Sequence, residues 1–258
     1  MKRYFLILVS LLLLANIYVL AQVQQEEDEP LPPKRNRGGK IGGAGGFTPG
    51  FLFFDFAPIN QYLSNANAAK LSDGPLALYG GTGYAYIMLV ENLRVGGIGM
   101  AGTRTSKALD PTTNTRRDVD YHIGYGGVTV EYVFPIKPRF DVTAGVMLGG
   151  GGVDIKMTRN INGTKVWNDL WNEFGDPNAT TDQYSRKLTG TFFIYQPQIN
   201  VEYAITRWIG VRVGVSYLGM AGSSWQMDDN YDVTGVPGDV KGEGFMLNTG
   251  LFIGTFLF

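Results

Sequence analysis

The stretch from Leu188 to Leu218 alternates between apolar and polar side chains along two segments that a short break separates. A period of two is typical of β-strands with one apolar face and one polar face. Each segment is about 15 residues long, which exceeds the ~9–11 residues that a tilted strand needs to cross a bilayer. The stretch therefore predicts a membrane-spanning hairpin whose apolar face carries Phe193, Tyr195, Pro197, Ile199, Val201 and Tyr203, then Ile209, Val211, Val213, Val215 and Tyr217.

The break at Thr206-Arg207-Trp208 fixes the register of this hairpin. A three-residue turn centred on Arg207 places Glu202 opposite Arg212 on the polar face. A slip of one residue would move every apolar side chain to the other face, so the pattern specifies this register strongly. The same turn predicts the apolar pairs Tyr203–Val211 and Val201–Val213.

The N-terminus has the features of a secretory signal. Lys2 and Arg3 precede a short apolar run, and small residues follow at the positions that a signal peptidase reads. Residues 1–21 are therefore expected to be a signal peptide. Residues 22–46 are acidic, then proline-rich, then basic and finally glycine-rich, and they predict a disordered periplasmic leader. The remaining residues, 47–258, are expected to form the folded domain.

Eight strands are predicted in that domain, and their connections alternate in length. The connections after the second, fourth and sixth strands are short, whereas those after the first, third, fifth and seventh are long and polar. The long loops are expected at about 57–75, 107–118, 159–187 and 227–242. The strands themselves are expected at about 47–56, 76–90, 94–106, 119–134, 139–156, 188–204, 209–225 and 243–258.

Short turns on one side and long loops on the other are typical of outer-membrane barrels. The fold class predicted is all-β, a closed eight-stranded antiparallel up-and-down transmembrane β-barrel with short helices in its extracellular loops. Apolar side chains would face lipid, and polar side chains would face a narrow interior. The competing fold is a soluble β-sandwich, in which the apolar faces of two sheets would meet in a packed core.

The last residues of the chain add a resemblance. Phe258 ends the chain and Phe256 lies two places earlier, as in the C-terminal strand signal of bacterial outer-membrane β-barrels, although Gly254 is one place later than the usual glycine. With the signal peptide and the strand pattern, the chain resembles small eight-stranded barrels of the OmpA, OmpX and OmpW kind over residues 47–258. The resemblance implies a place in the cell outer membrane, with outer-membrane lipid and the barrel-assembly machinery as partners.

A layer of charged side chains is predicted inside the barrel, near its periplasmic end. An unpaired charge in such an interior costs several kcal/mol, so these groups must pair or stay hydrated. With three carboxylates and one arginine, either Arg94 or Arg139 is expected to reach in and pair, or one carboxylate is expected to hold a proton. A structural network and an ion path both fit the pattern. The layer consists of Glu131, Asp141, Glu202 and Arg212, each about five residues from a predicted turn.

Two long loops contain residues with helical spacing. In the first, Pro58 is well placed to start a helix with apolar residues on one face. In the third, Trp167, Leu170, Trp171 and Phe174 follow the same spacing. Both helices are expected to cover the barrel mouth. The alternatives are contact with the outer leaflet or, for the loop aromatics Trp167 and Trp171, contact with an extracellular partner.

Other chemistry has little support in the sequence. His122 is the single histidine, with no serine near it in the sequence, and is expected to be an interfacial residue. The segment 228–232 lacks the glycine and glutamate of a calcium loop. No cofactor, metal or nucleic-acid partner is predicted, and the net charge of −1 gives no reason to expect a polyanion.

The function predicted is that of a non-enzymatic integral outer-membrane barrel with a structural or surface-contact role in adhesion or binding. Two alternatives stay open at this stage. One is a narrow channel for a small solute, because eight strands enclose an interior that side chains or one small ligand fill. The other is a lipid-modifying enzyme that would use His122.

Overall fold

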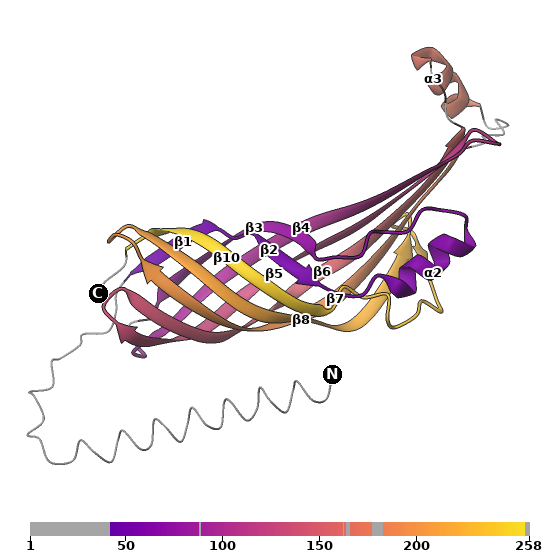
Figure 1. The fold of residues 1–258 in the computed structure, drawn as a ribbon. Helices are drawn as coiled ribbons and strands as arrows, with labels where there is room; N and C mark the ends of the chain where they lie inside the picture. Colours follow the sequence, from indigo (N-terminus) through magenta and orange to yellow (C-terminus); the bar gives the residue numbers. More distant parts are fainter. Residues whose placement is uncertain (1–41, 88, 162, 164–165, 177–182, 256–258) are drawn as a thin grey trace, which may run out of the picture. The chain divides into compact units, whose positions relative to one another are not determined.

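Antiparallel strands dominate the computed structural model, which describes residues 42–87, 89–161, 163, 166–176 and 183–255 (Figure 1). All of these residues belong to one compact unit, Gly39–Phe258. The elements in chain order are β1 (Gly43–Phe47), β2 (Gly50–Phe53), α2 (Ala57–Asn65), β3 (Leu76–Tyr86), β4 (Leu93–Asp110), β5 (Thr115–Lys137), β6 (Phe140–Ile161), α3 (Trp167–Gly175), β7 (Tyr184–Ala204), β8 (Ile209–Met227), β9 (Tyr231–Asp232) and β10 (Gly244–Gly254).

The first strand starts earlier than predicted. Gly43 to Phe47 form β1, so the strand begins four residues before the predicted start at Phe47 and includes part of the predicted leader, 22–46. The predicted signal peptide, 1–21, lies outside the described residues, as do Phe256 and Phe258 of the C-terminal signal. Those two features stay predictions.

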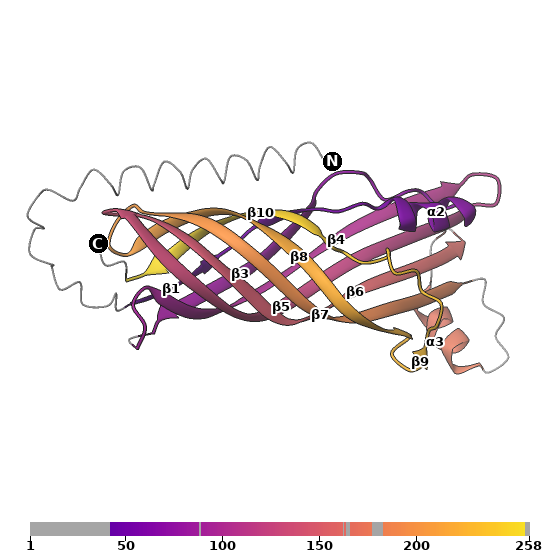
Figure 2. The same ribbon diagram turned by 90° about the horizontal axis from the view of Figure 1, so that it is seen from below.

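The sheet closes on itself. β1 and β2 act as two halves of one strand, because both pair with β3 on one side and with β10 on the other. β3 to β8 pair with their neighbours in sequence order, and β10 pairs with β8. The two-residue β9 only extends the edge of β8. The ring therefore has eight strands, all antiparallel, which confirms the predicted fold class; the strands wind around it with a common tilt (Figure 2).

The register of the β7–β8 hairpin agrees with its prediction. Glu202 pairs with Arg212, and the apolar pairs on either side follow as expected. The β5–β6 turn is shifted slightly from its predicted place, because β5 extends to Lys137 and leaves only Pro138 and Arg139 to reverse the chain. Arg139 adopts a left-handed φ of 73°, which such a tight turn requires.

The outward face of the barrel is an apolar band. Ile199, Val215 and Leu247 lie side by side on β7, β8 and β10, and they are 55%, 58% and 39% exposed. Val213, which is two residues from Val215 and on the same outward face of β8, is also exposed. No second sheet covers these side chains within the part of the chain that the structure describes, so the sandwich alternative is wrong. An outward apolar band around a closed ring is the arrangement of a transmembrane barrel of the outer-membrane type.

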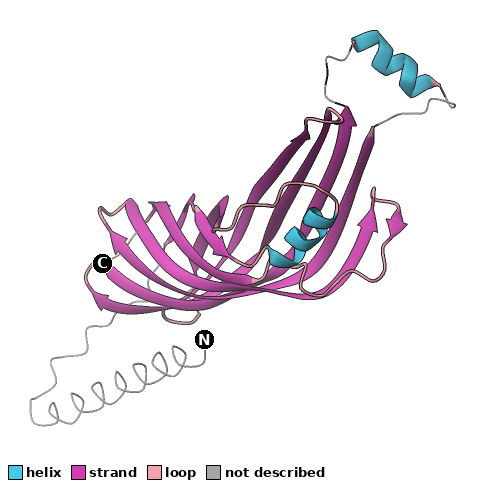
Figure 3. Cartoon of the chain, turned by 45° about the vertical axis from the view of Figure 1, so that its right-hand side comes forward, coloured by secondary structure: helices cyan, strands magenta, loops and turns pink. Residues whose placement is uncertain are grey.

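Four strands continue beyond the ring. Pairing of β3 with β4 ends at Tyr79 and Ala101, but β4, β5, β6 and β7 remain paired with one another for about eight more residues. We call this part, made of 103–110, 115–122, 154–161 and 184–189, the projecting sheet (Figure 3). The predicted loops 107–118 and 159–187 are therefore too long. Their outer parts are strands that the alternation of apolar residues did not reveal, because polar residues occupy both faces.

The barrel interior has two layers, which corrects the prediction of a polar interior. Near the short turns lies a polar layer, which includes Arg94, Glu131, Asn200 and Arg212. Toward the projecting sheet lies an apolar layer of buried side chains, and it includes Leu52, Leu78, Ile98, Met100, Tyr121, Ile123, Met147, Ile194, Leu218 and Met246.

Helix α2 belongs to the apolar layer, as predicted for a helix that covers the barrel mouth. Ile59 and Leu63 are buried in the core cluster. Asn60 fixes the following loop, because its side chain exchanges hydrogen bonds of 3.0 and 2.7 Å with the backbone of Leu71. Among the described residues, no helix is long and apolar enough to span a bilayer.

Replacing Val215 by arginine tests the lipid-facing band. We expect Val215→Arg to lower the free energy of unfolding in phospholipid vesicles by about 2–4 kcal/mol, because it places a charge in hydrocarbon. Urea titration, followed by the gel mobility of unboiled protein, measures the change. The matched control is Thr158→Arg, on the same outward face but in the projecting sheet, with an expected change below about 0.5 kcal/mol. Equal effects of the two substitutions would refute the membrane placement.

Candidate functional site: the lumen quartet and the projecting sheet

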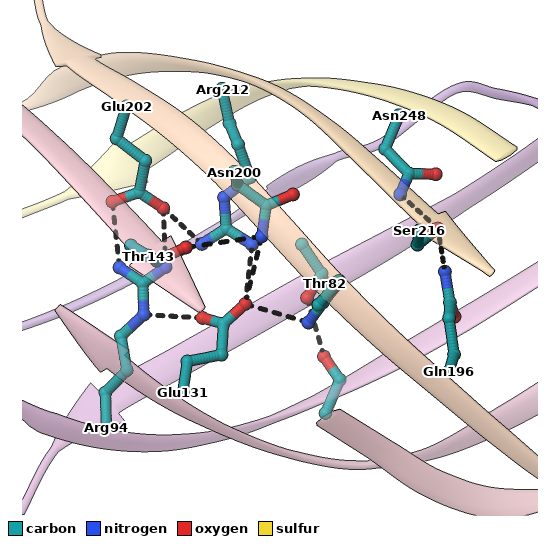
Figure 4. A network of polar contacts seen from close by, with 12 residues as sticks. Thr82, Arg94, Glu131, Thr143, Gln196, Asn200, Glu202, Arg212, Ser216 and Asn248 are labelled. Carbon is teal, nitrogen blue, oxygen red and sulfur yellow. Dashed lines mark hydrogen bonds and ion pairs between the residues drawn. The ribbon is translucent and has the colours of Figure 1, made fainter. Parts of the chain in front are cut away.

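Four charged side chains from four strands meet in the polar layer (Figure 4). They are Arg94 of β4, Glu131 of β5, Glu202 of β7 and Arg212 of β8, and we call them the lumen quartet. Their side chains are 0%, 2%, 11% and 6% exposed, respectively. The quartet is thus almost completely removed from solvent, where only paired charges are stable.

Each arginine of the quartet binds both glutamates. Arg94 donates from Nε to Glu131 at 2.5 Å, and from Nη1 and Nη2 to the two carboxylate oxygens of Glu202 at 2.8 and 2.6 Å. Arg212 lies 3.4 Å from Glu131 through Nη1 and 2.5 Å from Glu202 through Nη2. Two positive and two negative charges cancel, so the quartet carries no net charge into the interior.

The strand register brings the quartet together. Arg94 is the direct partner of Glu131 across β4 and β5, and Glu202 is the direct partner of Arg212 across β7 and β8. Directly opposite residues share a face of the sheet, and here that face is the interior. The two pairs then meet across the narrow lumen, where each supplies the counter-charge of the other.

Neighbouring side chains help to solvate the glutamates of the quartet. Gln198 and Asn200 donate to Glu131 Oε1 at 2.8 and 3.3 Å, so that every carboxylate oxygen of the quartet accepts at least one hydrogen bond or ion pair. The guanidinium of Arg94 lies 3.8 Å from the centre of the Tyr84 ring, and that of Arg212 lies 4.5 Å from Phe252. Aromatic faces attract cations at such distances, which holds the arginines in place on the sides that the glutamates leave open.

Glycines on the inward face leave room for these large polar groups. Gly145 is opposite Glu131, and a Cβ there would lie 2.7 Å from Glu131 Cγ. A Cβ at Gly96 would lie 2.9 Å from Thr129 Oγ1, and one at Gly214 would collide with the amide oxygen of Asn200. These three glycines therefore have a steric cause inside this narrow barrel.

An amide cluster separates the quartet from the apolar layer. Ser216 Oγ accepts hydrogen bonds of 2.8 Å from both Gln196 and Asn248. Beyond it, the hydroxyl of Tyr125 lies 3.3 Å from the sulfur of Met100 and 3.6 Å from that of Met246. The interior thus changes from ionic to amide to apolar contacts along the barrel axis.

Three of the four residues predicted for the charged layer, Glu131, Glu202 and Arg212, lie in the quartet, and Arg94 is its fourth member. Asp141 is opposite Glu202 in the register of β6 and β7, but it is partly exposed, whereas both glutamates are buried. Tyr84 and Phe252 were not predicted. The pairing of Arg94 with Glu131 was open to prediction, because the same register argument that paired Glu202 with Arg212 applies to β4 and β5.

The projecting sheet has a polar outward face. Thr105 donates to Asp120 across the strands at 2.6 Å, and Lys187 lies 3.5 Å from Asp154. In the turn between β4 and β5, hydrogen bonds from Thr113 and from the backbone of Thr112 lower the pKa of the Asp110 carboxyl. Charged ladders of this kind need water, so the projecting sheet lies beyond the apolar band.

His122 lies at the boundary between the apolar band and the projecting sheet. Its Nδ1 is 2.9 Å from the hydroxyl of Thr103, directly opposite on β4. Asp154 is its partner on β6, and that carboxylate forms an ion pair with Lys187. The two polar neighbours of His122 across the strands, Thr103 and Asp154, thus form cross-strand contacts that are common in β-sheets.

Helix α3 contains the predicted contact aromatics, and it does not cover the barrel interior. Trp167 and Trp171 are 69% and 58% exposed, and Phe174 is 85% exposed. Their rings touch one another, with centroids 5.6 Å apart for the two tryptophans and 6.2 Å apart for Trp171 and Phe174. The prediction that this helix is a lid is wrong for its aromatic face, which is open to solvent.

No protein-family model matches the chain, and no curated protein sequence does. Several solved structures are similar at low identity. They include the attachment invasion locus protein Ail of Yersinia pestis (11% identity, TM-score 0.37, covering 84% of this chain and 98% of that chain), the outer membrane protein OprG of Pseudomonas aeruginosa (9%, 0.38, 85% and 97%) and a major outer membrane protein of Thermus thermophilus (8%, 0.43, 83% and 98%).

Removing one arginine of the quartet should destabilise the barrel strongly. We expect Arg94→Met to lower the free energy of unfolding by about 3–5 kcal/mol, because two buried glutamates are left with one counter-charge. Adding Glu202→Gln to this variant should recover part of the loss, and a double-mutant cycle of urea unfolding in vesicles measures the coupling.

The control is Arg116→Met, which breaks an exposed ion pair with Asp118 and should cost less than about 1 kcal/mol. If Arg94→Met is no more destabilising than this control, the quartet does not stabilise the fold.

Proposed function

We propose that this protein is a non-enzymatic outer-membrane barrel with a closed lumen, whose projecting sheet and loops make contact with a partner outside the cell. The observation that carries the proposal is the continuation of β4, β5, β6 and β7 beyond the ring, with charged ladders on the outward face. A barrel that only needed to fill the membrane would have no use for paired strands in water.

The orientation follows from the connections. Three tight turns and the C-terminal end of β10 lie at one end of the ring. The projecting sheet and the connections that contain α2 and α3 lie at the other end. Outer-membrane barrels place short turns in the periplasm and long loops outside. The projecting sheet is therefore assigned to the extracellular side. Outer-membrane lipid would surround the apolar band, and the barrel-assembly machinery would insert it.

The projecting sheet is a firm support for contact loops. From His122 to Thr115, β5 adds seven residues, or about 23 Å of strand at about 3.3 Å per residue. Arg104 braces the base of the sheet, since it donates at 2.5 Å to the hydroxyl of Ser72 and at 2.6 Å to the carbonyl of Pro75. At the opposite edge, Arg186 forms an ion pair of 3.0 Å with Asp228. Loops on a rigid scaffold are the usual place for binding surfaces.

The packing of the barrel interior argues against transport through the lumen. The quartet crosses the lumen between four strands, and each of its arginines is held by two carboxylates. The apolar layer and α2 fill the other half. A solute would have to break charge-assisted hydrogen bonds first and then pass through packed side chains. The proposal is therefore a closed barrel, in place of the narrow channel.

A catalytic role of His122 has little support in its contacts. A histidine base needs a nucleophile and an orienting group in hydrogen-bond reach. The observed neighbour is the hydroxyl of Thr103, and the nearby carboxylate of Asp154 is paired with Lys187. The proposed role is to end the lipid-facing band with a polar cross-strand pair.

Shortening the projecting sheet tests the proposal directly. Ser106 pairs with Val119 and Met157 pairs with Arg186, so an Asn-Gly turn can replace 107–118 and another can replace 158–185. We expect the shortened barrel to insert and keep its heat-dependent gel mobility, while cells that carry it lose attachment to host cells or matrix. Attachment of the full-length chain that is no greater than that of the shortened barrel would contradict the proposal.

The closed lumen predicts a negligible ion current. Planar bilayers with the full-length protein should show no steady conductance steps above background, because the quartet and the apolar layer fill the interior. The comparison is Arg94→Ser combined with Arg212→Ser, which should show no steady conductance either, because the apolar layer still fills the other half of the interior. Steady wild-type channels would support the transport alternative.

A further inference from the structure

Helix α3 presents an aromatic face that the described chain leaves uncovered. Val166, Trp167, Trp171 and Phe174 are each more than half exposed, and Leu170 is 39% exposed. These residues occupy one side of the helix at positions i, i+3, i+4 and i+7, with Val166 directly before it. Monomeric proteins rarely expose a contiguous apolar surface of this kind unless something binds there.

The aromatic rings form one continuous surface. Trp167 touches Trp171 at an interplanar angle of 70°, and Trp171 touches Phe174 at 87°. Residues that anchor a helix in a protein groove enter separate pockets, each with its own walls. Rings that contact one another instead form a broad apolar face that cannot enter separate pockets. A lipid surface, which is fluid and has no fixed pockets, accommodates such a face better than a protein groove does.

The polar side of α3 excludes an anionic surface. Glu173 and Asp176 are acidic, and the segment from Val166 to Asp176 contains no lysine or arginine. Helices that bind anionic lipid carry lysine and arginine on the polar face. An acidic helix would be repelled there, whereas a zwitterionic surface of phosphocholine head groups presents no net charge. Tryptophan is also the residue that prefers the boundary between head groups and acyl chains.

We infer that α3 docks onto a zwitterionic phospholipid membrane apposed to the bacterial surface, with Trp167, Trp171 and Phe174 in its interface. The inference rests on the proposed function, and it names the partner chemistry for one loop of that contact surface. α3 connects β6 and β7, and β6 continues seven residues past Asp154 before this connection begins. The projecting sheet thus holds the base of the loop away from the cell's own leaflet.

Flotation of the full-length protein with vesicles tests the inference. The protein is placed in nanodiscs of anionic phosphatidylglycerol, so that the disc does not compete, and is mixed with phosphatidylcholine vesicles. We expect Trp167→Ala combined with Trp171→Ala to lower vesicle binding at least about tenfold, because two large amphipathic side chains leave the interface. The matched control is Tyr231→Ala, an equally exposed aromatic residue (64%) outside α3, which should bind as the wild type does.

Charge provides the second arm of the experiment. Wild-type protein should bind phosphatidylglycerol vesicles and lipopolysaccharide-containing vesicles at least about tenfold more weakly than phosphatidylcholine vesicles, and Glu173→Lys should narrow that difference. Equal binding to all three surfaces, or stronger binding to the lipopolysaccharide, would overturn the assignment to an apposed zwitterionic membrane.

The proposed function and this inference fail in different ways. If the wild type does not float with protein-free phosphatidylcholine vesicles, or the double tryptophan variant floats equally well, α3 does not bind lipid and a protein groove becomes its partner. Loss of cell attachment in the shortened barrel, which lacks α3 as well as the outer part of the sheet, would still support the projecting sheet and its loops together as the contact surface. If vesicles bind but attachment is independent of the projecting sheet, the inference holds for α3 and the broader proposal fails.

Discussion

Closure of the hydrogen-bond ladder between β10 and the pair β1 and β2 is the constraint on which the whole structure depends. In hydrocarbon, an unpaired backbone group costs several kcal/mol, so a sheet can cross a membrane only if it has no edge. The interruption at Thr48 and Pro49 does not open the ring. The amide of Thr48 donates to Gly80 at 2.9 Å, and the carbonyl of Pro49 accepts from Thr249 at 3.0 Å. The first strand thus stays paired on both sides while it changes direction.

A ring of eight strands leaves an interior that side chains must fill, and the two layers fill it by different means. At the end with the short turns, charged and amide groups satisfy one another, because glycines such as Gly145 and Gly214 leave space for them. At the other end, aliphatic residues pack against α2, and Leu71 is fixed there by Asn60. The apolar layer needs no hydrogen-bond geometry, so it can accept a loop helix as part of the core.

The amino-acid sequence predicts the parts of this fold that one strand face determines. Alternation between lipid-facing and inward residues fixes the β7–β8 hairpin and the pair Glu202–Arg212, because a slip would expose every polar group to lipid. It does not predict the length of the projecting sheet, where polar residues on both faces remove the alternation. It also misses the apolar layer: Ile194 or Leu218, inside the barrel, looks in sequence no different from a residue that faces lipid. The position of Arg94 is predictable in part, because its pairing with Glu131 follows from the register once β4 and β5 are recognised as neighbours.

The separation of the interior from the surface has a consequence for how such a protein works. The arginines of the quartet are each held by two carboxylates, and the apolar layer is buried up to the base of the projecting sheet. Under the proposed function, a partner that bound the loops would meet a lumen whose charged groups are paired and whose apolar groups are packed. Recognition at the projecting sheet, as proposed, would then depend on the residues presented there, such as the exposed rings of α3, and on the distance that β4 to β7 provide. The barrel contributes by holding that surface firmly in place.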